Sequence, residues 1–443
     1  MTLEELQGLV DKGEIDTVLL ALCDMQGRLQ GKRLHARHFV DEVAAHGAEA
    51  CNYLLAVDVE MNTVSGFAMS SWEGGYGDFV LRPDFDTLSA VPWQEGTAMI
   101  LADVAWEDGS DVAASPRQIL RGQIARLGEH GWHPFAGTEL EFVVFEDSYE
   151  RAWDRGYTAM TPANRYNVDY SLLGTARVEP LLRAIRNAMH AAGMRVEDAK
   201  GECNLGQHEI NFHYGPALQS CDRHAIYKNG AKEIAAQQGM SITFMAKYDQ
   251  REGSSCHVHL SLQDSGGAPL FARDDELFDH FLAGQIATLP ELTLLLAPNV
   301  NSYKRFAAGT FAPTTVAWGH DNRTCAFRVV GHGASKRIEC RVPGADCNPY
   351  LTLAALIAGG LHGVEQSLEL EPALEGNAYS AADRPQVPKT LRDARDAFAG
   401  SAVARAAFGD EVVAHYLNMA DVELAAFGAA VTDWERVRGF ERL

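Results

Sequence analysis

Residues 135–145 read FAGTELEFVVF, a stretch in which two glutamates alternate with apolar side chains. Because successive side chains of a β-strand point to opposite faces of a sheet, Glu139 and Glu141 share one face, and Leu140 and Phe142 share the other. One face of such a strand can pack on a core while the other carries polar groups. We therefore predict a strand here whose polar face is available for chemistry.

Three other stretches repeat this alternation: GQHEINFHY, CHVHLSL and KRIECRV. The polar residues that share a face within each of them are Glu209, Asn211, His213, His257, His259, Ser261, Arg337, Glu339 and Arg341. Any one stretch alone is also typical of an ordinary half-buried strand whose polar face meets water. A solvated face would mix Lys, Thr, Ser and Gln, whereas these faces supply almost only Glu, His and Arg. We interpret them as parts of one site.

Carboxylates that meet in one site repel one another unless cations neutralise them. The acidic and imidazole candidates are Glu139, Glu141, Glu202, Glu209, Glu339, His257 and His259. Oxygen-rich ligation with a single imidazole suits Mg²⁺ or Mn²⁺ rather than zinc or copper. Five acids and a histidine can serve two such ions, and a pair of ions suits phosphoryl transfer because it neutralises nucleotide phosphates.

Arginines gather in one part of an otherwise acidic chain. The sequence has 38 basic and 60 acidic residues, a formal charge of −22, yet five arginines fall close together: Arg305, Arg323, Arg328, Arg337 and Arg341. Guanidinium groups match phosphate and carboxylate geometry with two parallel hydrogen bonds. For any one of them a surface ion pair is the alternative. Metal ligands together with arginines indicate a nucleotide and a carboxylate substrate.

Composition limits the class of protein. The 443 residues are 47% hydrophobic and 22% charged, enough for two or three domains with a substantial core. The acidic balance argues against a nucleic-acid or anionic-membrane partner. The start lacks the basic segment of a signal peptide, and the longest apolar run, 351–364, is typical of a buried helix. The eight cysteines show no C-x-x-C pair, so we expect reduced thiols and a cytoplasmic protein.

The chain divides near residue 108. Before it, TVLLALCD, GKRLHARHF and GTAMILADVAW predict short strands separated by turns. After the polar linker EDGSDVAA, Ser115 and Pro116 predict the start of a helix. We therefore expect domains at 1–108 and 109–443. From residue 370 onward the Ala-rich sequence is typical of helices.

Several long motifs, in order along nearly the whole chain, resemble those of glutamine synthetases of type I. NSYKRFAAGTFAPTTVAWGHDNRT and KRIECRVPGADCNPYLTLAALIAGGLHG resemble the C-terminal signature, and GTELEF, KGECNLGQHEINF and GSSCHVHLSL resemble the metal and nucleotide segments. GDFVLRPDFDT and DMQGRLQGKRL resemble parts of the N-terminal domain. The resemblance implies an α+β fold: an N-terminal β-grasp domain and a catalytic domain with a curved antiparallel sheet surrounded by helices.

The resemblance also implies roles for individual residues. Glu141, Glu202 and Glu209 would hold a first divalent ion, and Glu139, His257 and Glu339 a second that bridges the nucleotide phosphates. The remaining implied roles are phosphate binding and transfer for Arg323, Arg328 and Arg337, glutamate binding for Arg305, Arg341 and Gly253, and nucleotide binding for His259, Ser261 and Arg337. ATP would phosphorylate the glutamate side chain, and an amine would attack the γ-glutamyl phosphate, a step governed by positioning and charge neutralisation.

One departure from the family pattern concerns the amine. Glutamine synthetases carry a loop like PGYEAP whose Glu helps deprotonate ammonium, but this chain has AGTFAP, with Phe311 in that place. The ammonium-binding FDGSS segment is also not recognisable in VSGFAMSSWEGGYGD. Ammonium needs acceptors, which an aromatic ring lacks, whereas an organic amine has an apolar body that Phe311, Trp72 or Tyr76 could contact. Phe311 could instead only pack its loop.

Other departures lie nearby. Lys200 and Gly201 stand before Glu202, where many relatives carry two histidines. Glu252 replaces a usual Asn beside the expected glutamate amino group, where it could attract a cationic amine or simply pair with Arg251. The aromatic-rich segment YERAWDRGYTAMTPANRYNVDY could shape substrate access.

These features predict a ligase of the family's γ-glutamyl-amine branch, acting on a polyamine, ethanolamine or an alkylamine. The alternatives are an ordinary ammonia-dependent glutamine synthetase and a catalytically silent structural or regulatory member. The resemblance implies a homo-dodecamer with active sites between neighbouring subunits. The sequence leaves open which amine is used, which group deprotonates it, and whether the ions are Mg²⁺ or Mn²⁺.

Overall fold

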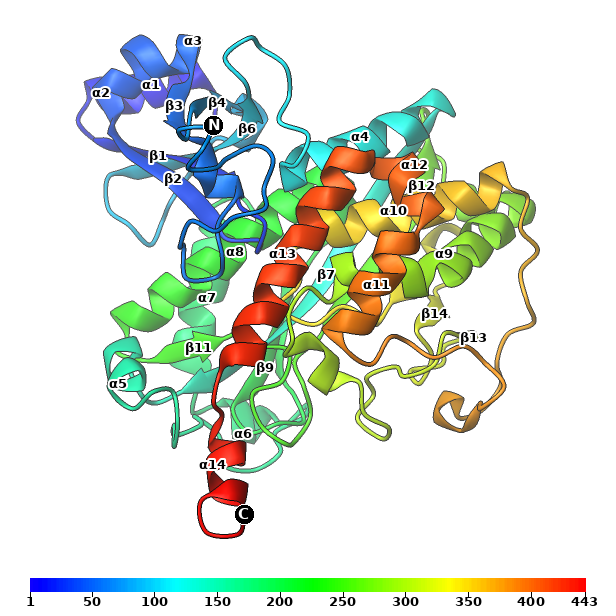
Figure 1. The fold of residues 1–443 in the computed structure, drawn as a ribbon. Coiled ribbons are helices and arrows are strands. Elements are labelled where there is room, and N and C mark those ends of the chain that lie inside the picture. The colour runs from blue at the N-terminus through cyan, green and yellow to red at the C-terminus, as the bar shows by residue number, and fades with distance from the viewer.

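The N-terminal part of the chain is built on a six-stranded sheet. The structure is a computed structural model that describes residues 1–443. The strands follow the order β2-β1-β6-β4-β3, with β5 paired to β6, and only the β1–β6 pair is parallel. Their bounds are β1 Thr17–Cys23, β2 Leu29–His35, β3 Ala48–Cys51, β4 Asp78–Pro83, β5 Ser89–Ala90 and β6 Thr97–Ala105. Figure 1 shows this region in blue, above the rest of the chain.

The two faces of this sheet serve two different cores. Along β1, Val18, Leu20 and Leu22 pack with helix α1 (Leu3–Asp11) in a core of 19 buried residues. The alternate residues Leu19 and Ala21 belong to the larger core of 78 buried residues. The sheet therefore has its own core on one side and is fused to the catalytic region on the other, and the domain boundary at 108/109 stays a prediction.

One expected strand is shorter than its sequence indicated. GKRLHARHF was predicted as a strand, but β2 ends at His35 and the chain continues as α2 (Ala36–His38) and a π-helical turn (Phe39–Val43). The turn places Phe39, fully buried, in the core against α1, a position that an extended strand could not give it. Tertiary packing has overridden the local strand preference.

The catalytic region is built on a nine-stranded sheet in the order β13-β14-β15-β12-β7-β9-β8, with β10 and β11 paired to β7. All neighbours are antiparallel except the parallel pair β13–β14. The bounds are β7 Trp132–Phe145, β8 Val196–Gly201, β9 Gln207–Phe212, β10 Gly215–Pro216, β11 Ser241–Thr243, β12 Cys256–Asp264, β13 Trp318–His320, β14 Phe327–Val330 and β15 Arg337–Cys340. The strands predicted from the four alternating stretches are confirmed as β7, β9, β12 and β15.

Helices surround this sheet, and the antiparallel pair α9 and α10 forms much of the larger core. The helix bounds are α3 Ala44–His46, α4 Pro116–Glu129, α5 Tyr149–Asp154, α6 Leu172–Thr175, α7 Glu179–Ala191, α8 Ala217–Gln237, α9 Asp275–Leu296, α10 Pro349–Glu365, α11 Leu391–Gly400, α12 Ala402–Phe408, α13 Asp410–Ala429 and α14 Asp433–Gly439. The helix predicted to start at Pro116 and the buried helix predicted for 351–364 are confirmed as α4 and α10. In Figure 1, α13 runs across the front and α14 extends to the C-terminus.

The crossing of α9 and α10 explains the glycines in the second helix. A Cβ atom on Gly363 would lie 2.0 Å from the carbonyl oxygen of His280, so only glycine allows this approach. None of the helices combines the length and apolar character needed to cross a membrane. All eight cysteines are free thiols, as predicted.

A buried ion cluster joins the two sheets. Arg117 at the start of α4 is only 3% exposed in its side chain and pairs with Asp222 of α8 at 2.9 Å. The same guanidinium reaches Asp84 at 2.7 Å and Asp103 at 2.5 Å, both from the N-terminal region. Since a buried charge is stable only when it is paired, this cluster fixes how the N-terminal sheet sits on the catalytic region.

Candidate active site

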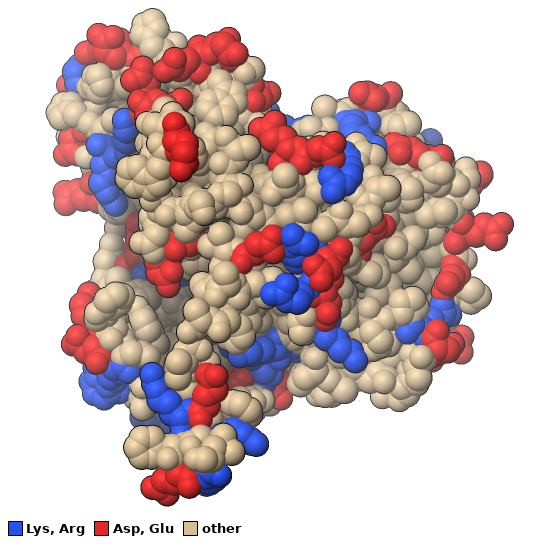
Figure 2. All heavy atoms as spheres, viewed as in Figure 1, with Lys and Arg blue, Asp and Glu red and all other residues tan.

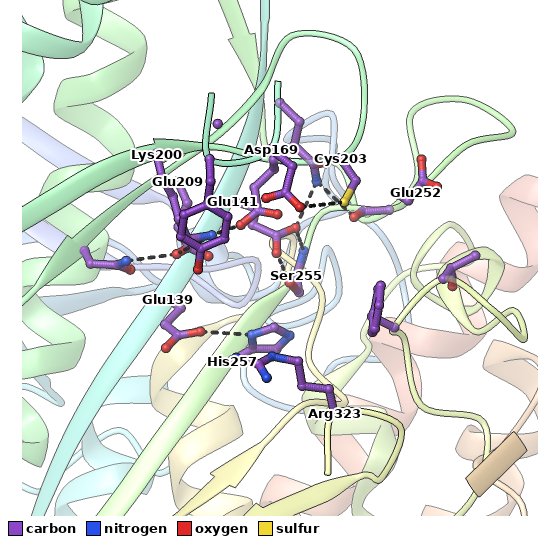
Figure 3. Close-up of a pocket in the computed structure, with 18 of the residues that line it drawn as sticks. Glu139, Glu141, Asp169, Lys200, Cys203, Glu209, Glu252, Ser255, His257 and Arg323 are labelled. Atoms are coloured by element: carbon purple, nitrogen blue, oxygen red, sulfur yellow. Dashed lines mark hydrogen bonds and ion pairs between the residues drawn. The ribbon is translucent and has the colours of Figure 1, made fainter. Parts of the chain in front are cut away.

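The polar faces of the catalytic sheet open into a cavity of about 650 Å³, shown in Figure 3. Cross-strand register brings their functional side chains together. Glu139 of β7 lies opposite His257 of β12, and Glu141 of β7 lies opposite Glu209 of β9. Glu339 of β15 completes the row beyond β12. The alternation that predicted polar faces therefore places them on one side of one sheet.

The first set of candidate ligands, here named the Glu139 cluster, consists of Glu139, His257 and Glu339. Each offers a ligand atom within 4.8 Å of the others. His257 Nδ1 lies 3.1 Å from Glu139 Oε2 and 3.6 Å from Glu339 Oε1. Arg341 pairs with the fully buried Glu339, and Arg328 Nη1 lies 2.8 Å from its other oxygen. Two arginines thus balance this cluster.

Burial alone would raise the pKa values of Glu139 and Glu339. Hydrogen bonds with His257 and His259 hold the pKa of Glu139 below its usual range, and His257 and Arg341 do the same for Glu339. Burial and the charge of Arg341 lower the pKa of His257 to about 4. The imidazole is therefore neutral at pH 7, and arginine charge is what keeps Glu339 ionised.

The second set, here named the Glu141 cluster, consists of Glu141, Glu202 and Glu209, whose ligand atoms also lie within 4.8 Å of one another. Burial and the charges of the neighbouring acids raise the pKa of Glu141. Burial also raises the pKa values of Glu202 and Glu209, although Lys200 opposes the shift in both. Like charges crowd in this cluster, and one lysine partly offsets them.

Glu141 is held in place by neutral donors. Its Oε2 accepts hydrogen bonds from the backbone N–H of Ser255 at 2.8 Å and from the side-chain amide of Gln207 at 2.9 Å. These bonds orient the carboxylate toward the cluster but supply no full positive charge.

The donor sets of both clusters fit hard divalent cations. The Glu141 cluster offers only carboxylate oxygens, and the Glu139 cluster adds one neutral imidazole nitrogen. Mg²⁺ and Mn²⁺ prefer such ligands, whereas zinc and copper sites use more nitrogen or sulfur. The six residues proposed from the sequence as metal ligands thus fall into two groups of three, divided as the resemblance implied, while their roles stay predictions.

Four of the candidate arginines line the cavity: Arg305, Arg323, Arg328 and Arg341. Arg305 is buried and donates to the backbone carbonyls of Arg341 at 3.0 Å and Val342 at 2.9 Å. Fixed guanidinium groups of this kind can bind carboxylate or phosphate without rearranging.

Four other candidates lie outside the lining of the cavity: Glu339, His259, Ser261 and Arg337. His259 Nε2 lies 2.8 Å from Glu139, and Arg337 Nε donates to His259 Nδ1 at 3.2 Å. Arg337 and His259 therefore reach the cavity only indirectly, through Glu139. Ser261 pairs with Phe135 near the far end of β12. The nucleotide-binding roles of His259, Ser261 and Arg337 stay predictions.

The candidates for substrate specificity also line the cavity. They include Gly253, Glu252 and Phe311. Phe311 is 55% exposed and has a φ of 57°, the left-handed region, on the loop that precedes β13. Glu252 forms no ion pair with Arg251, so that alternative is not seen. Trp72 and Tyr76 stack edge to face with each other and do not line this cavity.

Sequence reasoning missed two features of the site. Asp169 lines the cavity and has a ligand atom within 4.8 Å of Glu202 and Cys203, and Figure 3 shows it beside Cys203. Lys200 pairs with both Glu202 and Glu209. Asp169 sits in the segment noted only for its aromatic content, and Lys200 was noted only as a departure. The position of Lys200 two residues before Glu202 was a signal for that residue, whereas no sequence signal pointed to Asp169.

Figure 2 shows acidic and basic side chains interspersed over the face it presents, on a chain with a net charge of −22. A basic surface of the kind that binds nucleic acid is not apparent on this face.

Known proteins share both the sequence and the fold. Residues 113–438 match the family model described as glutamine synthetase, catalytic domain. The chain is 65% identical to gamma-glutamylethanolamide synthetase of Streptomyces coelicolor, over 99% of this chain and 96% of that protein. It is 37% identical to glutamate–isopropylamine ligase of a Pseudomonas species, over 98% of this chain and 97% of that protein.

Solved structures indicate the same family as these sequence relatives. A structure of GmaS in complex with ADP superimposes with a TM-score of 0.87 at 28% identity, covering 98% of this chain and 99% of that one. The same protein without ligand gives a TM-score of 0.86. The motifs, the two clusters of acidic side chains on a curved sheet and these matches agree, and the chain belongs to the glutamine synthetase family.

Proposed function

We propose that this chain is an ATP-dependent ligase that joins the γ-carboxylate of glutamate to ethanolamine through a γ-glutamyl phosphate. The observation that carries the proposal is its 65% identity, over almost the full length of both chains, to a gamma-glutamylethanolamide synthetase. The cavity supports it, because Phe311 occupies the loop position where the sequence lacks an ammonium-deprotonating acid. Relatives that act on isopropylamine and on putrescine place the chain among amine ligases more broadly.

Phosphoryl transfer is assigned to the two clusters and the arginines. The Glu139 and Glu141 clusters would hold two or more divalent ions, Mg²⁺ or Mn²⁺, which neutralise the phosphates of ATP when bound. Arg323 and Arg328 line the same cavity and would hold the transferring phosphoryl group. Glu339 keeps Arg328 oriented through its 2.8 Å ion pair. Most of the rate enhancement would come from positioning and charge neutralisation.

Glutamate binding is assigned to Arg305, Arg341 and Gly253. Both arginines are buried and line the cavity, and their backbone and side-chain contacts fix their guanidinium groups. A carboxylate arriving there would replace water with preformed donors, which favours binding because little reorganisation is needed. The γ-carboxylate would then point toward the metal clusters.

The amine end is assigned to the part of the cavity lined by Asp169, Glu252 and Phe311. Ethanolamine arrives at neutral pH as a cation, and it needs carboxylate acceptors that hold the ammonium and take its proton. Asp169 and Glu252 both lack an ion pair within the chain, so they are available for this role. Phe311 would cover the two methylene groups.

Assembly and location are further parts of the proposal. We infer a homo-oligomer, with twelve subunits and active sites at subunit boundaries, as the resemblance to the family implies. In such an assembly Trp72 and Tyr76, which lie away from the chain's own cavity, would be available to a neighbour. A cytoplasmic location stays a prediction.

The test is phosphate release from ATP with glutamate and Mg²⁺, measured across ethanolamine, ammonium, putrescine, spermidine, isopropylamine and methylamine, with mass detection of the product. We expect turnover with ethanolamine and a product of the mass of γ-glutamylethanolamide. Robust glutamine formation from ammonium, with little turnover of ethanolamine, would show that the chain is an ordinary glutamine synthetase. Silence with every amine despite bound metal would support a non-catalytic member.

A matched pair of variants separates the role of Phe311 from simple packing of its loop. Phe311→Leu keeps an apolar side chain, while Phe311→Glu restores an acid at that position. We expect Phe311→Glu to lower kcat/KM for ethanolamine relative to ammonium by about tenfold, because an acid favours the smaller cation. Phe311→Leu should change that ratio far less. Equal ratios in both variants would show that Phe311 only packs the loop.

A further inference from the structure

Lys200 places a positive charge inside the Glu141 cluster. It lies on β8 directly opposite Glu209 of β9, and its ammonium pairs with Glu202 and, at 3.2 Å, with Glu209 Oε1. Its side chain is 22% exposed. Figure 3 shows Lys200 beside Glu209 on the inner wall of the cavity. The ammonium therefore occupies space between two carboxylates that would ligate an ion.

No other cation forms an ion pair with these three carboxylates. Lys200 is the only lysine that lines the cavity, and none of the arginines there pairs with Glu141, Glu202 or Glu209. By contrast, Arg328 and Arg341 both pair with Glu339 in the Glu139 cluster. Three crowded carboxylates without a cation would repel one another, so Lys200 holds this part of the site together when no ion is bound.

Lys200 also has a place to which it can withdraw. Its Nζ lies 5.1 Å from the centroid of the Tyr170 ring, and Tyr170 lines the same cavity. The face of an aromatic ring attracts an ammonium group through its quadrupole. The side chain can therefore leave the carboxylates without leaving all favourable contacts.

We propose that Lys200 is the resident counter-ion of the Glu141 cluster, and that a divalent ion binds there only by displacing its ammonium from Glu202 and Glu209. In the Glu139 cluster the cations pair only with Glu339, and Glu139 contacts only histidines, whereas the ammonium of Lys200 engages two of the three carboxylates of the Glu141 cluster. This inference rests on the proposed role of both clusters as metal sites.

The experiment titrates the full-length protein, stripped of metal with a chelator, with Mn²⁺ while free Mn²⁺ is followed by electron paramagnetic resonance. The variants are Lys200→Met, which keeps the length of the side chain, and Lys200→Arg, which keeps the charge. Lys336→Met is the matched control, because Lys336 also pairs with an acid, Asp275 at 3.0 Å, and lies over an aromatic ring, Phe278.

We expect the wild type to bind Mn²⁺ in two classes. Lys200→Met should tighten one of them by about tenfold, because removal of one competing cation removes its repulsion and its occupancy of the site. The other class should not change. Lys200→Arg and Lys336→Met should bind Mn²⁺ as the wild type does.

Thermal unfolding provides a second readout that does not depend on the fitted affinities. In chelator, Lys200→Met should unfold at a lower temperature than wild type and gain more stability from added Mn²⁺. Weaker or unchanged Mn²⁺ binding in Lys200→Met would overturn the inference and leave the metal sites intact. Absence of Mn²⁺ binding in the wild type would overturn the proposed function itself.

Discussion

The Glu139 cluster and the Glu141 cluster occupy neighbouring strands of one sheet but balance their charges in opposite ways. In the first, Glu339 is fully buried yet remains ionised, because Arg341 and Arg328 pair with its two oxygens. In the second, one lysine pairs with two of the three carboxylates, and the pKa values of all three rise. In the first cluster, arginines balance the carboxylate charge without an ion. In the second, negative charge remains unbalanced until an ion binds.

This difference follows from which strands supply the neighbours. β14 and β15 bring arginines to one side of β12, and β8 and β9 bring acids and a lysine to the other side of β7. The predictions below test this contrast.

The largest effect is expected from Glu339→Gln, which removes the charge that balances two arginines. Kcat/KM should fall by about 10³-fold, and the free energy of unfolding should fall by about 3–5 kcal/mol because buried guanidinium charge is left uncompensated. Phosphate release and urea denaturation measure the two effects. A variant as stable as wild type in chelator would contradict the balance described for this cluster.

Glu209→Gln should separate activity from stability. It removes one ligand and one of the crowded charges, so activity should fall by about 10²-fold. In chelator, however, the free energy of unfolding should rise by about 1 kcal/mol, because repulsion at a buried carboxylate is relieved. Urea denaturation with and without Mg²⁺ tests this. Destabilisation in chelator similar to that of Glu339→Gln would mean that the clusters do not differ.

The pH dependence of stability should differ in sign between the clusters. A carboxyl group whose pKa is raised by folding holds more protons in the folded state, so the stability of the metal-free protein falls as pH rises from the ordinary Glu range toward the raised values. The lowered pKa values of Glu139 and Glu339 contribute stability that is lost only as pH falls through them.

In chelator, the stability contributed by the Glu141 cluster should therefore fall by about 3–5 kcal/mol between about pH 5.5 and pH 8.5. Glu209→Gln should reduce this slope, and saturating Mg²⁺ should abolish or reverse it because metal displaces protons. Thermal unfolding across this range, with a surface Glu→Gln variant such as Glu276→Gln as control, measures the slope. An identical slope in Glu209→Gln and wild type would contradict the assignment.

The smallest effect is expected from Asp321→Asn. Asp321 pairs with Arg328 but its side chain is 73% exposed, whereas the partner that buries the same guanidinium is Glu339. Loss of an exposed ion pair should change the free energy of unfolding by no more than about 0.5 kcal/mol. Urea denaturation and the KM for ATP check this. A loss of unfolding free energy comparable to that of Glu339→Gln would show that Asp321, rather than Glu339, holds Arg328 in place.

Much of the site was predictable because alternation along a strand is a local property. The spacing of Glu139 and Glu141, and of His257 and His259, placed each pair on a common face, and the strands formed as expected. Cross-strand register is not local, however, so the pairing of Lys200 with Glu209 could not be read from the sequence. How far along a strand the cavity extends also cannot be read from local sequence. Ser261 lies beyond the cavity that its strand helps to form.

Tertiary contacts decided the remaining differences. The end of β2 depends on the burial of Phe39 against α1, which local strand preference does not contain. Asp169 reaches the cavity on a long segment between α5 and α6, and the path of such a segment depends on what it packs against.

The backbone conformation of Phe311 restricts which residues can replace it, and so which substitutions there can change the amine substrate. Its φ of 57° suits glycine, asparagine and aspartate, and is costly for valine, isoleucine or threonine. Directed evolution that randomises this position will therefore recover few β-branched residues, whatever amine is selected. Leu172 and Thr175 also line the cavity, so new specificities that need a β-branched side chain should arise there more readily than at position 311.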